Sequence, residues 1–91
     1  MKFENILAQF GFETQRDGSM RWAAGSLMWG DAIQVWTVKD GYKVEIAKWE
    51  YNCDGDAIID ECETRTLDAA HALQWMAEKF PIGLWKAMVQ G

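Results

Sequence analysis

The sequence predicts an α+β fold: an N-terminal helix, a three- to five-stranded antiparallel meander, and a C-terminal helix packed on the sheet. Apolar residues recur at helical spacing near both ends of the chain, whereas the centre is rich in β-branched and aromatic residues. Asp-Gly pairs at positions 40–41 and 54–55 interrupt that centre, and such pairs are typical of tight hairpin turns. With 91 residues, 49% of them apolar, the chain is predicted to form one domain over residues 1–91.

A single apolar stripe predicts the N-terminal helix. Its members stand at i, i+3, i+4 and i+7: Phe3, Ile6, Leu7 and Phe10. Gly11 follows, where a helix commonly ends in a left-handed residue. Residues 12–15 are expected to form a short strand that turns at Asp17-Gly18 into a second strand over residues 20–24. Residues 25–30 are expected to form a loop.

The central segments predict three strands, over residues 32–38, 42–51 and 57–66. Two-residue turns fix their register, because each turn sets which residues stand opposite one another. The second turn places Trp49 opposite Asp60, Ala47 opposite Cys62 and Tyr51 opposite Ile58. The first turn places Trp36 opposite Glu45 and Val35 opposite Ile46.

These pairings sort the central strands into two faces. One face collects Trp36, Val38, Ala47, Trp49, Tyr51, Ile58 and Cys62. The other collects Ile33, Val35, Val44, Ile46 and Ile59, followed by Lys48, Glu50, Glu61, Glu63 and Arg65. A sheet with apolar residues on both faces calls for cover on both.

The C-terminal helix is predicted to start at Thr66 as N-cap, with Asp68 in its first turn. Its apolar positions follow a helical period: Ala69, Leu73, Met76 and Phe80. Pro81 is expected to end it. A final helical turn is expected around Leu84, Trp85, Met88 and Val89.

The surplus negative charge lies between Glu45 and Asp68, where eight acidic residues face only Lys48 and Arg65 as bases. A concentrated charge of one sign selects partners and speeds encounter. Because nucleic acid repels negative charge, direct binding of DNA or RNA is not expected. The expected partner is instead a protein with a basic surface.

Residues 52–63 resemble a calcium-binding EF-hand loop in the spacing of their oxygen-bearing side chains. Two features favour a hairpin turn instead. Ala57 stands where that loop requires glycine, and residues 42–51 alternate as a strand does. His71, the only histidine, is expected on the helix surface, and no metal, cofactor or catalytic arrangement is predicted.

Cys53 and Cys62 stand too far apart along the predicted hairpin to be bridged, so we expect free thiols and a reducing, cytoplasmic location. No segment is long and apolar enough to suggest a membrane span or a signal peptide, so no membrane association is expected.

Two features are open to a structural and a functional interpretation. The aromatic stripe of Trp36, Trp49 and Tyr51 is either core beneath the C-terminal helix or an interface, since Trp and Tyr dominate binding hot spots. The acidic hairpin is either a solubilising surface or a docking surface. The candidate partner-binding residues are Glu50, Asp54, Asp56, Asp60, Glu61, Glu63, Trp36, Trp49 and Tyr51.

The sequence therefore predicts a small, acidic, non-enzymatic protein-interaction module, as monomer or homodimer. A narrower hypothesis is an inhibitor that blocks the nucleic-acid-binding site of its partner, as small acidic phage and mobile-element proteins of the anti-CRISPR type do. That hypothesis is an analogy of class, based on size, charge and aromatic content. The alternatives are a structural or homo-oligomeric subunit that buries its aromatic face, a calcium-binding module at residues 52–63, and, least favoured, a small enzyme.

Overall fold

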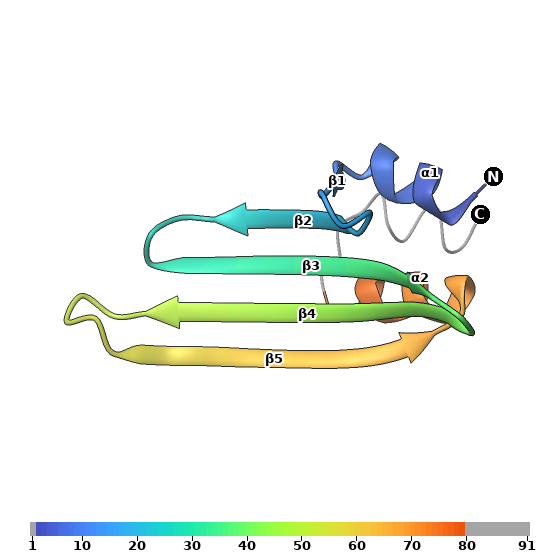
Figure 1. Ribbon diagram of the computed structural model, residues 1–91. Coiled ribbons are helices and arrows are strands. Elements are labelled where there is room, and N and C mark those ends of the chain that lie inside the picture. The colour runs from blue at the N-terminus through green and yellow to red at the C-terminus, as the bar shows by residue number, and fades with distance from the viewer. Residues whose placement is uncertain (1, 80–91) are drawn as a thin grey trace.

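The computed structural model describes residues 2–79. In chain order its elements are α1 (Phe3–Gln9), β1 (Glu13–Thr14), β2 (Met20–Gly25), β3 (Trp29–Val38), β4 (Gly41–Tyr51), β5 (Ala57–Leu67) and α2 (Ala69–Lys79). The strands form one antiparallel sheet in the order β1-β2-β3-β4-β5 (Figure 1). The α+β class is confirmed, with a strand number at the upper end of the predicted range. The predicted stop at Pro81 and the turn around residues 84–89 lie outside the described residues.

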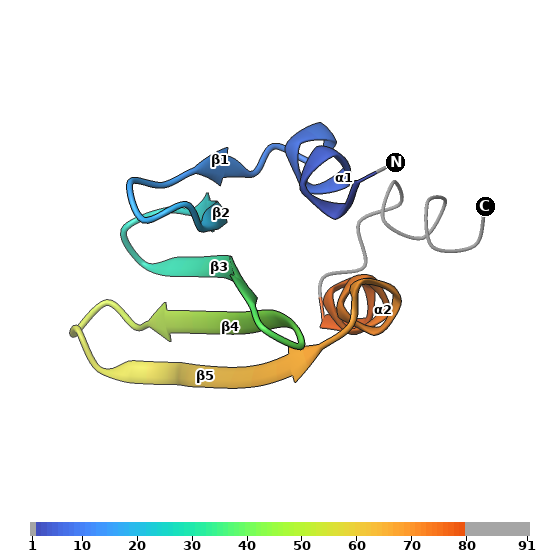
Figure 2. The ribbon, with the colours of Figure 1, turned by 45° about the vertical axis from the view of Figure 1, so that its right-hand side comes forward.

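Both helices lie on the same face of the sheet, at one end of it (Figure 2). The core fills the space between them and the strands, and five of its members are fully buried: Leu7 from α1, Ile33 from β3, Val44 from β4, and Ala72 and Met76 from α2. The whole cluster comprises Phe3, Leu7, Phe12, Met20, Ile33, Val35, Val44, Ile46, Ala72, Trp75, Met76 and Ala77. The N-terminal stripe and the packing of the C-terminal helix on the sheet are thus confirmed.

The start of α2 differs by two residues from its prediction. Thr66 still belongs to β5, and Asp68 is the capping residue. A side-chain oxygen of Asp68 accepts a hydrogen bond from the His71 N–H at 2.8 Å, and its carbonyl accepts one from the Ala72 N–H at 2.9 Å. Aspartate satisfies an orphan donor of the first turn and adds negative charge at the positive end of the helix, so Asp68 takes the capping role that was predicted for Thr66.

The register between β4 and β5 follows the prediction over most of its length. Trp49 stands opposite Asp60 and Ala47 opposite Cys62. The pairing of Tyr51 with Ile58 is wrong, because Tyr51 faces Ala57 across an irregularity at the end of the ladder. Five residues, 52–56, connect these strands in place of a two-residue turn. The Asn52 side-chain oxygen closes the loop by accepting hydrogen bonds from the backbone N–H groups of Asp54 and Asp56, each at 2.9 Å.

The register between β3 and β4 is shifted by two residues from the prediction. Trp36 faces Lys43 instead of Glu45, and Val35 faces Val44 instead of Ile46. The turn consists of residues 39 and 40, so Gly41 already belongs to β4, with a φ of +145°. A Cβ at this position would lie 2.6 Å from the Leu67 carbonyl oxygen, so the close approach of β5 requires glycine in the strand. A shift of two preserves the predicted faces.

The helices cover the face that carries Ile33, Val35, Val44 and Ile46, and the aromatic stripe lies on the opposite face. The interpretation of Trp36, Trp49 and Tyr51 as core beneath the C-terminal helix is therefore wrong. The expected second strand is confirmed, but the expected loop over residues 25–30 is only residues 26–28, because Gly25 ends β2 and β3 begins at Trp29, three residues earlier than expected.

Candidate functional site

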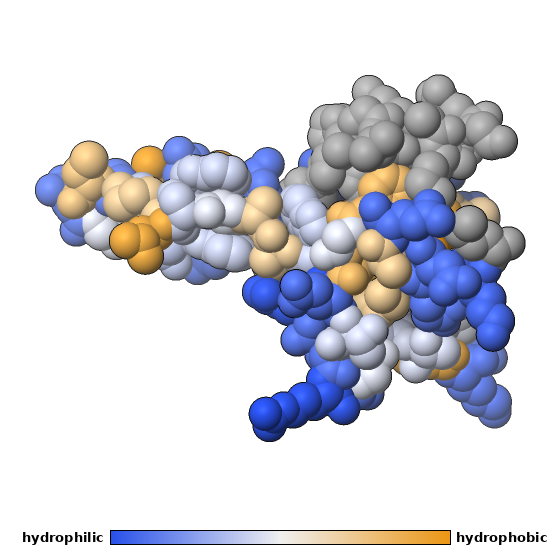
Figure 3. Space-filling view, turned by 90° about the horizontal axis from the view of Figure 1, so that it is seen from above, coloured by the Kyte–Doolittle hydropathy of each residue, from blue (hydrophilic) through white to orange (hydrophobic). Residues whose placement is uncertain are grey.

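The longest strands extend beyond the part of the sheet that the helices cover. At about 1.5 Å per residue, helices of 7 and 11 residues are about 10 and 16 Å long, whereas strands of 11 residues span about 36 Å. Past the rung formed by Trp22, Ile33, Ile46 and Glu63, the strands continue as a projecting ribbon (Figures 1 and 3). We call this ribbon, residues 23–32 and 47–62, the distal arm.

The distal arm carries a charge equal to that of the entire chain. It contains six carboxylates against the single base Lys48, a formal charge of −5, and the remaining residues balance at eight acids and eight bases. The six are Asp31, Glu50, Asp54, Asp56, Asp60 and Glu61. The structure thus confines the surplus negative charge to a smaller region than the sequence segment Glu45–Asp68 indicated, because this charge lies on one projecting element.

The end of the arm is also apolar (Figure 3). Four of the five most exposed large hydrophobic side chains among residues 2–79 belong to it: Leu27 (97% exposed), Ile58 (61%), Trp29 (48%) and Met28 (41%). The Tyr51 N–H donates a hydrogen bond to the Met28 carbonyl at 2.7 Å, which holds the β2–β3 loop against the end of β4. Exposed apolar residues with a charged rim are typical of interaction surfaces. We call these four residues the apolar tip.

Sequence reasoning missed most of the apolar tip. It assigned Leu27, Met28 and Trp29 to a loop and drew no consequence from their character. The signal was present: three consecutive large apolar residues lie between Gly25-Ser26 and Gly30, where connecting segments are usually polar.

Trp49 lies on the open face of the arm, across the backbone of Gly30. A Cβ at Gly30 would overlap Cζ2 and Cε2 of the indole, so the absence of a side chain at Gly30 makes room for the ring. Small residues continue this face along the next rung, where Ala32, Ala47 and Cys62 stand side by side. Trp49 is therefore a half-buried aromatic platform on an otherwise flat surface.

The predicted acidic residues are all exposed but do not form one row. Glu50, Glu61 and Glu63 share the helix-side face of the sheet, as expected. Asp60 lies on the opposite face with its cross-strand neighbour Trp49, and Asp54 and Asp56 lie in the loop at the end of the arm. Carboxylates thus surround the arm on both faces and at its end.

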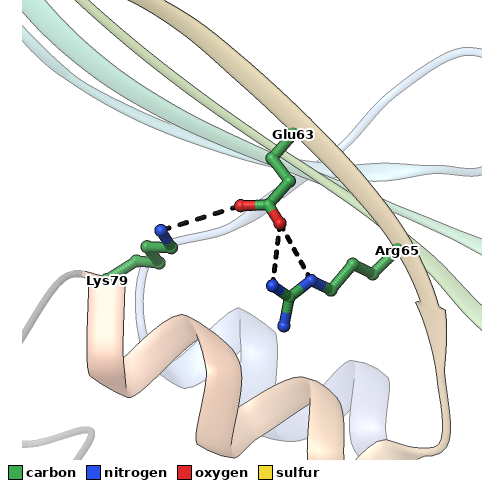
Figure 4. A network of polar contacts seen from close by, with 3 residues as sticks. All are labelled: Glu63, Arg65 and Lys79. Atoms are coloured by element: carbon green, nitrogen blue, oxygen red, sulfur yellow. Dashed lines mark hydrogen bonds and ion pairs between the residues drawn. The ribbon is translucent and has the colours of Figure 1, made fainter.

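Glu63 differs from the other acids because its charge is compensated inside the molecule (Figure 4). Its Oε1 accepts hydrogen bonds from Arg65 Nη2 at 2.8 Å and Nε at 3.0 Å, and its Oε2 lies 3.6 Å from Lys79 Nζ of α2. The hydrogen bonds from Arg65, followed by the two positive charges, hold the pKa of Glu63 below its ordinary value. The Arg65 guanidinium also stacks over the buried Trp75 ring, 4.6 Å from its centroid. Glu63 therefore anchors α2 to β5.

Trp36 is likewise engaged within the fold. Its Nε1–H donates to Asp17 Oδ2 at 3.1 Å, and the Lys43 ammonium lies 4.5 Å from its ring centroid. Asp17 also accepts hydrogen bonds from the side chain and the backbone N–H of the buried Ser19, which lower the pKa of the Asp17 carboxyl. Along β3, Trp36 is six residues, about 20 Å, from the position opposite Trp49. The aromatic stripe is therefore split: Trp49 and Tyr51 belong to the arm and Trp36 to the base.

The other residues that the sequence singled out for metal binding, catalysis or a disulfide do not come together in one site. Residues 57–63 are strand, and within residues 2–79 no group of three or more His, Cys, Asp or Glu side chains is placed to hold a metal ion, so the oxygens of the EF-hand-like segment are not brought together. His71 is exposed and lies 2.8 Å from Asp68 on the helix end. Cys53 and Cys62 are free and exposed.

An open groove of roughly 430 Å³ beside α2 is lined by Ile46, Lys48, Glu61, Cys62, Glu63 and Lys79.

In the part of the chain that the structure describes, neither helix is long and apolar enough to cross a bilayer. Compared with protein-family models, curated proteins and solved structures, the chain has no match.

Proposed function

We propose that this chain is a non-enzymatic protein-interaction module whose distal arm docks on a basic surface of a partner protein. One observation supports this most directly: the net charge of the chain and most of the exposed large apolar side chains found among residues 2–79 coincide on the same projecting ribbon. The apolar residues would form the core of the interface and the carboxylates its rim. Apolar contacts give affinity, and the charges orient the basic partner as it approaches.

The composition of the arm favours docking over a merely solubilising role. A solubilising surface needs charge but gains nothing from Leu27 and Ile58 among the carboxylates, because exposed apolar groups promote association. Five acids, Glu50, Asp54, Asp56, Asp60 and Glu61, form no ion pair with any residue between 2 and 79. Their charges are therefore available to arginine and lysine of a partner.

In its narrower form the proposal is that the docked arm occupies a site that otherwise binds nucleic acid. Carboxylates on a stiff ribbon can meet the same cations that hold phosphates. An inhibitor of the anti-CRISPR type would work in this way, and a cytoplasmic setting fits the two free thiols. A competition assay addresses this form directly: the chain should displace a labelled oligonucleotide from the captured partner.

Site-specific photocrosslinking tests the general proposal. A photoreactive phenylalanine analogue replaces Leu27 at the apolar tip or, as a matched control, the exposed Gln74 on α2. In cytosol of cells that express the chain, we expect crosslinks from position 27 to proteins with basic surfaces, strongly reduced by 0.5 M salt, and few from position 74. Equal crosslinking from both positions, or salt-insensitive adducts from position 27, would contradict the docking role of the arm.

A further inference from the structure

Strand β5 is an exposed edge of the sheet. Within residues 2–79 it pairs with β4 alone, and the meander order leaves its other side without a neighbour. It is 11 residues long, and nine of those residues are exposed. An edge strand presents a row of backbone N–H and C=O groups that can pair with another strand. β5 is therefore able to accept an additional strand along the distal arm.

The sheet has a second free edge of different character. Among the described residues, β1 pairs only with Met20 and Arg21 of β2, so no strand of the sheet lies beside residues 22–25 on that side. That stretch is short and uncharged. Length and charge thus distinguish the two edges, and a charged partner strand has a reason to choose β5.

The side chains of β5 indicate what such a strand contains. Asp60 and Glu61 are adjacent, so they project on opposite faces and together require two consecutive cations on a paired strand. Ile58 and Ile59 precede them and favour apolar partners, whereas Glu63 is already compensated by Arg65 and Lys79. In antiparallel pairing the complementary segment reads, from its N-terminus, two basic residues followed by two apolar residues.

The same charges disfavour pairing between two copies of this chain. An antiparallel β5–β5 pair centred on Glu61 would place that carboxylate directly opposite its own copy, a centre at Asp60 would do the same for Asp60, and a centre at Cys62 would place Glu61 opposite Glu63. Like charges that face one another across strands are destabilising. Inward or edge charges of this kind are a common protection of edge strands against self-association.

We propose that the partner contributes an extended basic segment, which adds to the sheet as a sixth strand along β5. This inference rests on the docking role of the arm and specifies its geometry: main-chain hydrogen bonds along the edge supply affinity, and the Asp60–Glu61 pair selects lysine or arginine.

Synthetic peptides test the pairing with the full chain. The probe is a short peptide with two adjacent lysines followed by two valines, flanked by threonines. A second peptide has the same charge but carries proline in place of the first valine, and a third carries glutamates in place of the lysines. Binding is measured by fluorescence anisotropy at low salt, and the site by hydrogen exchange of the backbone amides.

We expect the probe to protect amides of residues 58–64 from exchange and to leave residues 22–25 unchanged. Proline removes a backbone donor and restricts the strand conformation, so that peptide should bind at least about tenfold more weakly. The glutamate peptide should not bind. In the chain, Asp60→Asn with Glu61→Gln should weaken probe binding more than Asp54→Asn with Asp56→Asn, which removes the same charge from the loop.

Other outcomes overturn strand addition in distinguishable ways. Equal binding of the probe and the proline peptide, or equal effects of the two double variants, would mean that the acidic arm attracts cations without pairing, which leaves the docking function intact. Protection confined to residues 22–25 would place the added strand on the wrong edge. No binding of any peptide would remove the inference, while crosslinking from position 27 would still decide the function.

Discussion

At the scale of single residues, the arm depends on a contact between an indole and a backbone without a side chain. Trp49 rests on Gly30, and the next rung of that face consists of Ala32, Ala47 and Cys62, so the indole ring projects above these small side chains. A half-buried tryptophan offers a partner a rigid apolar platform at low entropic cost. The glycine thus determines where the indole ring lies, and under the proposed docking role this position decides what the arm presents to a partner.

Gly30→Ala should therefore displace the Trp49 ring and destabilise the fold by about 1–3 kcal/mol, the usual cost of overpacking. Urea denaturation measures the change. In a Trp49→Ala background the ring is absent, so the same Gly30→Ala substitution should cost much less. An equal cost in both backgrounds would show that the contact does not explain the glycine.

At the scale of elements, α2 is fixed at both ends by carboxylates. Asp68 caps the start of α2. At the end of the helix, Glu63 of β5 accepts hydrogen bonds from Arg65 and lies near the ammonium group of Lys79. The backbone N–H of His71, followed by its side chain, lowers the pKa of Asp68, and Arg65 lowers that of Glu63. The position of the helix, and with it the boundary between base and arm, thus depends on ionised groups.

These lowered pKa values predict acid sensitivity with a definite sign. A carboxyl group whose pKa is lower in the folded state stabilises the fold at pH values above its ordinary pKa, and this contribution is lost as the pH falls through the folded-state value. The urea midpoint should therefore decrease below about pH 5, as Asp17, Glu63 and Asp68 become protonated.

A matched pair of variants isolates the contribution of the cap. Asn is also a good N-cap but does not ionise, so Asp68→Asn should retain the fold at neutral pH and reduce the acid-induced decrease. Asp40→Asn, at the exposed β3–β4 turn, serves as the control and should reduce it less. An unchanged pH profile in Asp68→Asn would contradict the role given to the cap.

The elements also show what sequence could and could not predict. Apolar periodicity and the Asp-Gly pairs predicted both helices, the boundaries of three strands to within one residue, and the two faces of the sheet. These features could be predicted because they depend on the local sequence. The predicted β3–β4 register was wrong because Gly41 lies in β4, where it allows the close approach of the Leu67 backbone, and not in the turn. Which carboxylates are free was also not predictable, since the Glu63 contact with Lys79 joins two separate elements.

At the scale of the whole molecule, short helices on long strands produce a base and an arm. The two helices are too short to cover the sheet, so no helix among residues 2–79 covers either face of its far half, and the net charge resides there. A charged projection of this kind orients an approaching cationic partner before contact, which speeds association more than it slows dissociation. In the docking proposed above, the apolar tip then provides the apolar contacts.

The most direct test of the docking role is the association rate with the partner captured by crosslinking, measured across ionic strengths. Asp54→Lys with Asp56→Lys reverses two charges on the arm, and Glu13→Lys with Glu78→Lys makes the same change in net charge on the base. We expect the arm variant to associate at least about tenfold more slowly at low salt, with a weaker salt dependence, and the base variant to remain close to the original chain. Equal association rates for the two variants would contradict the docking role of the arm.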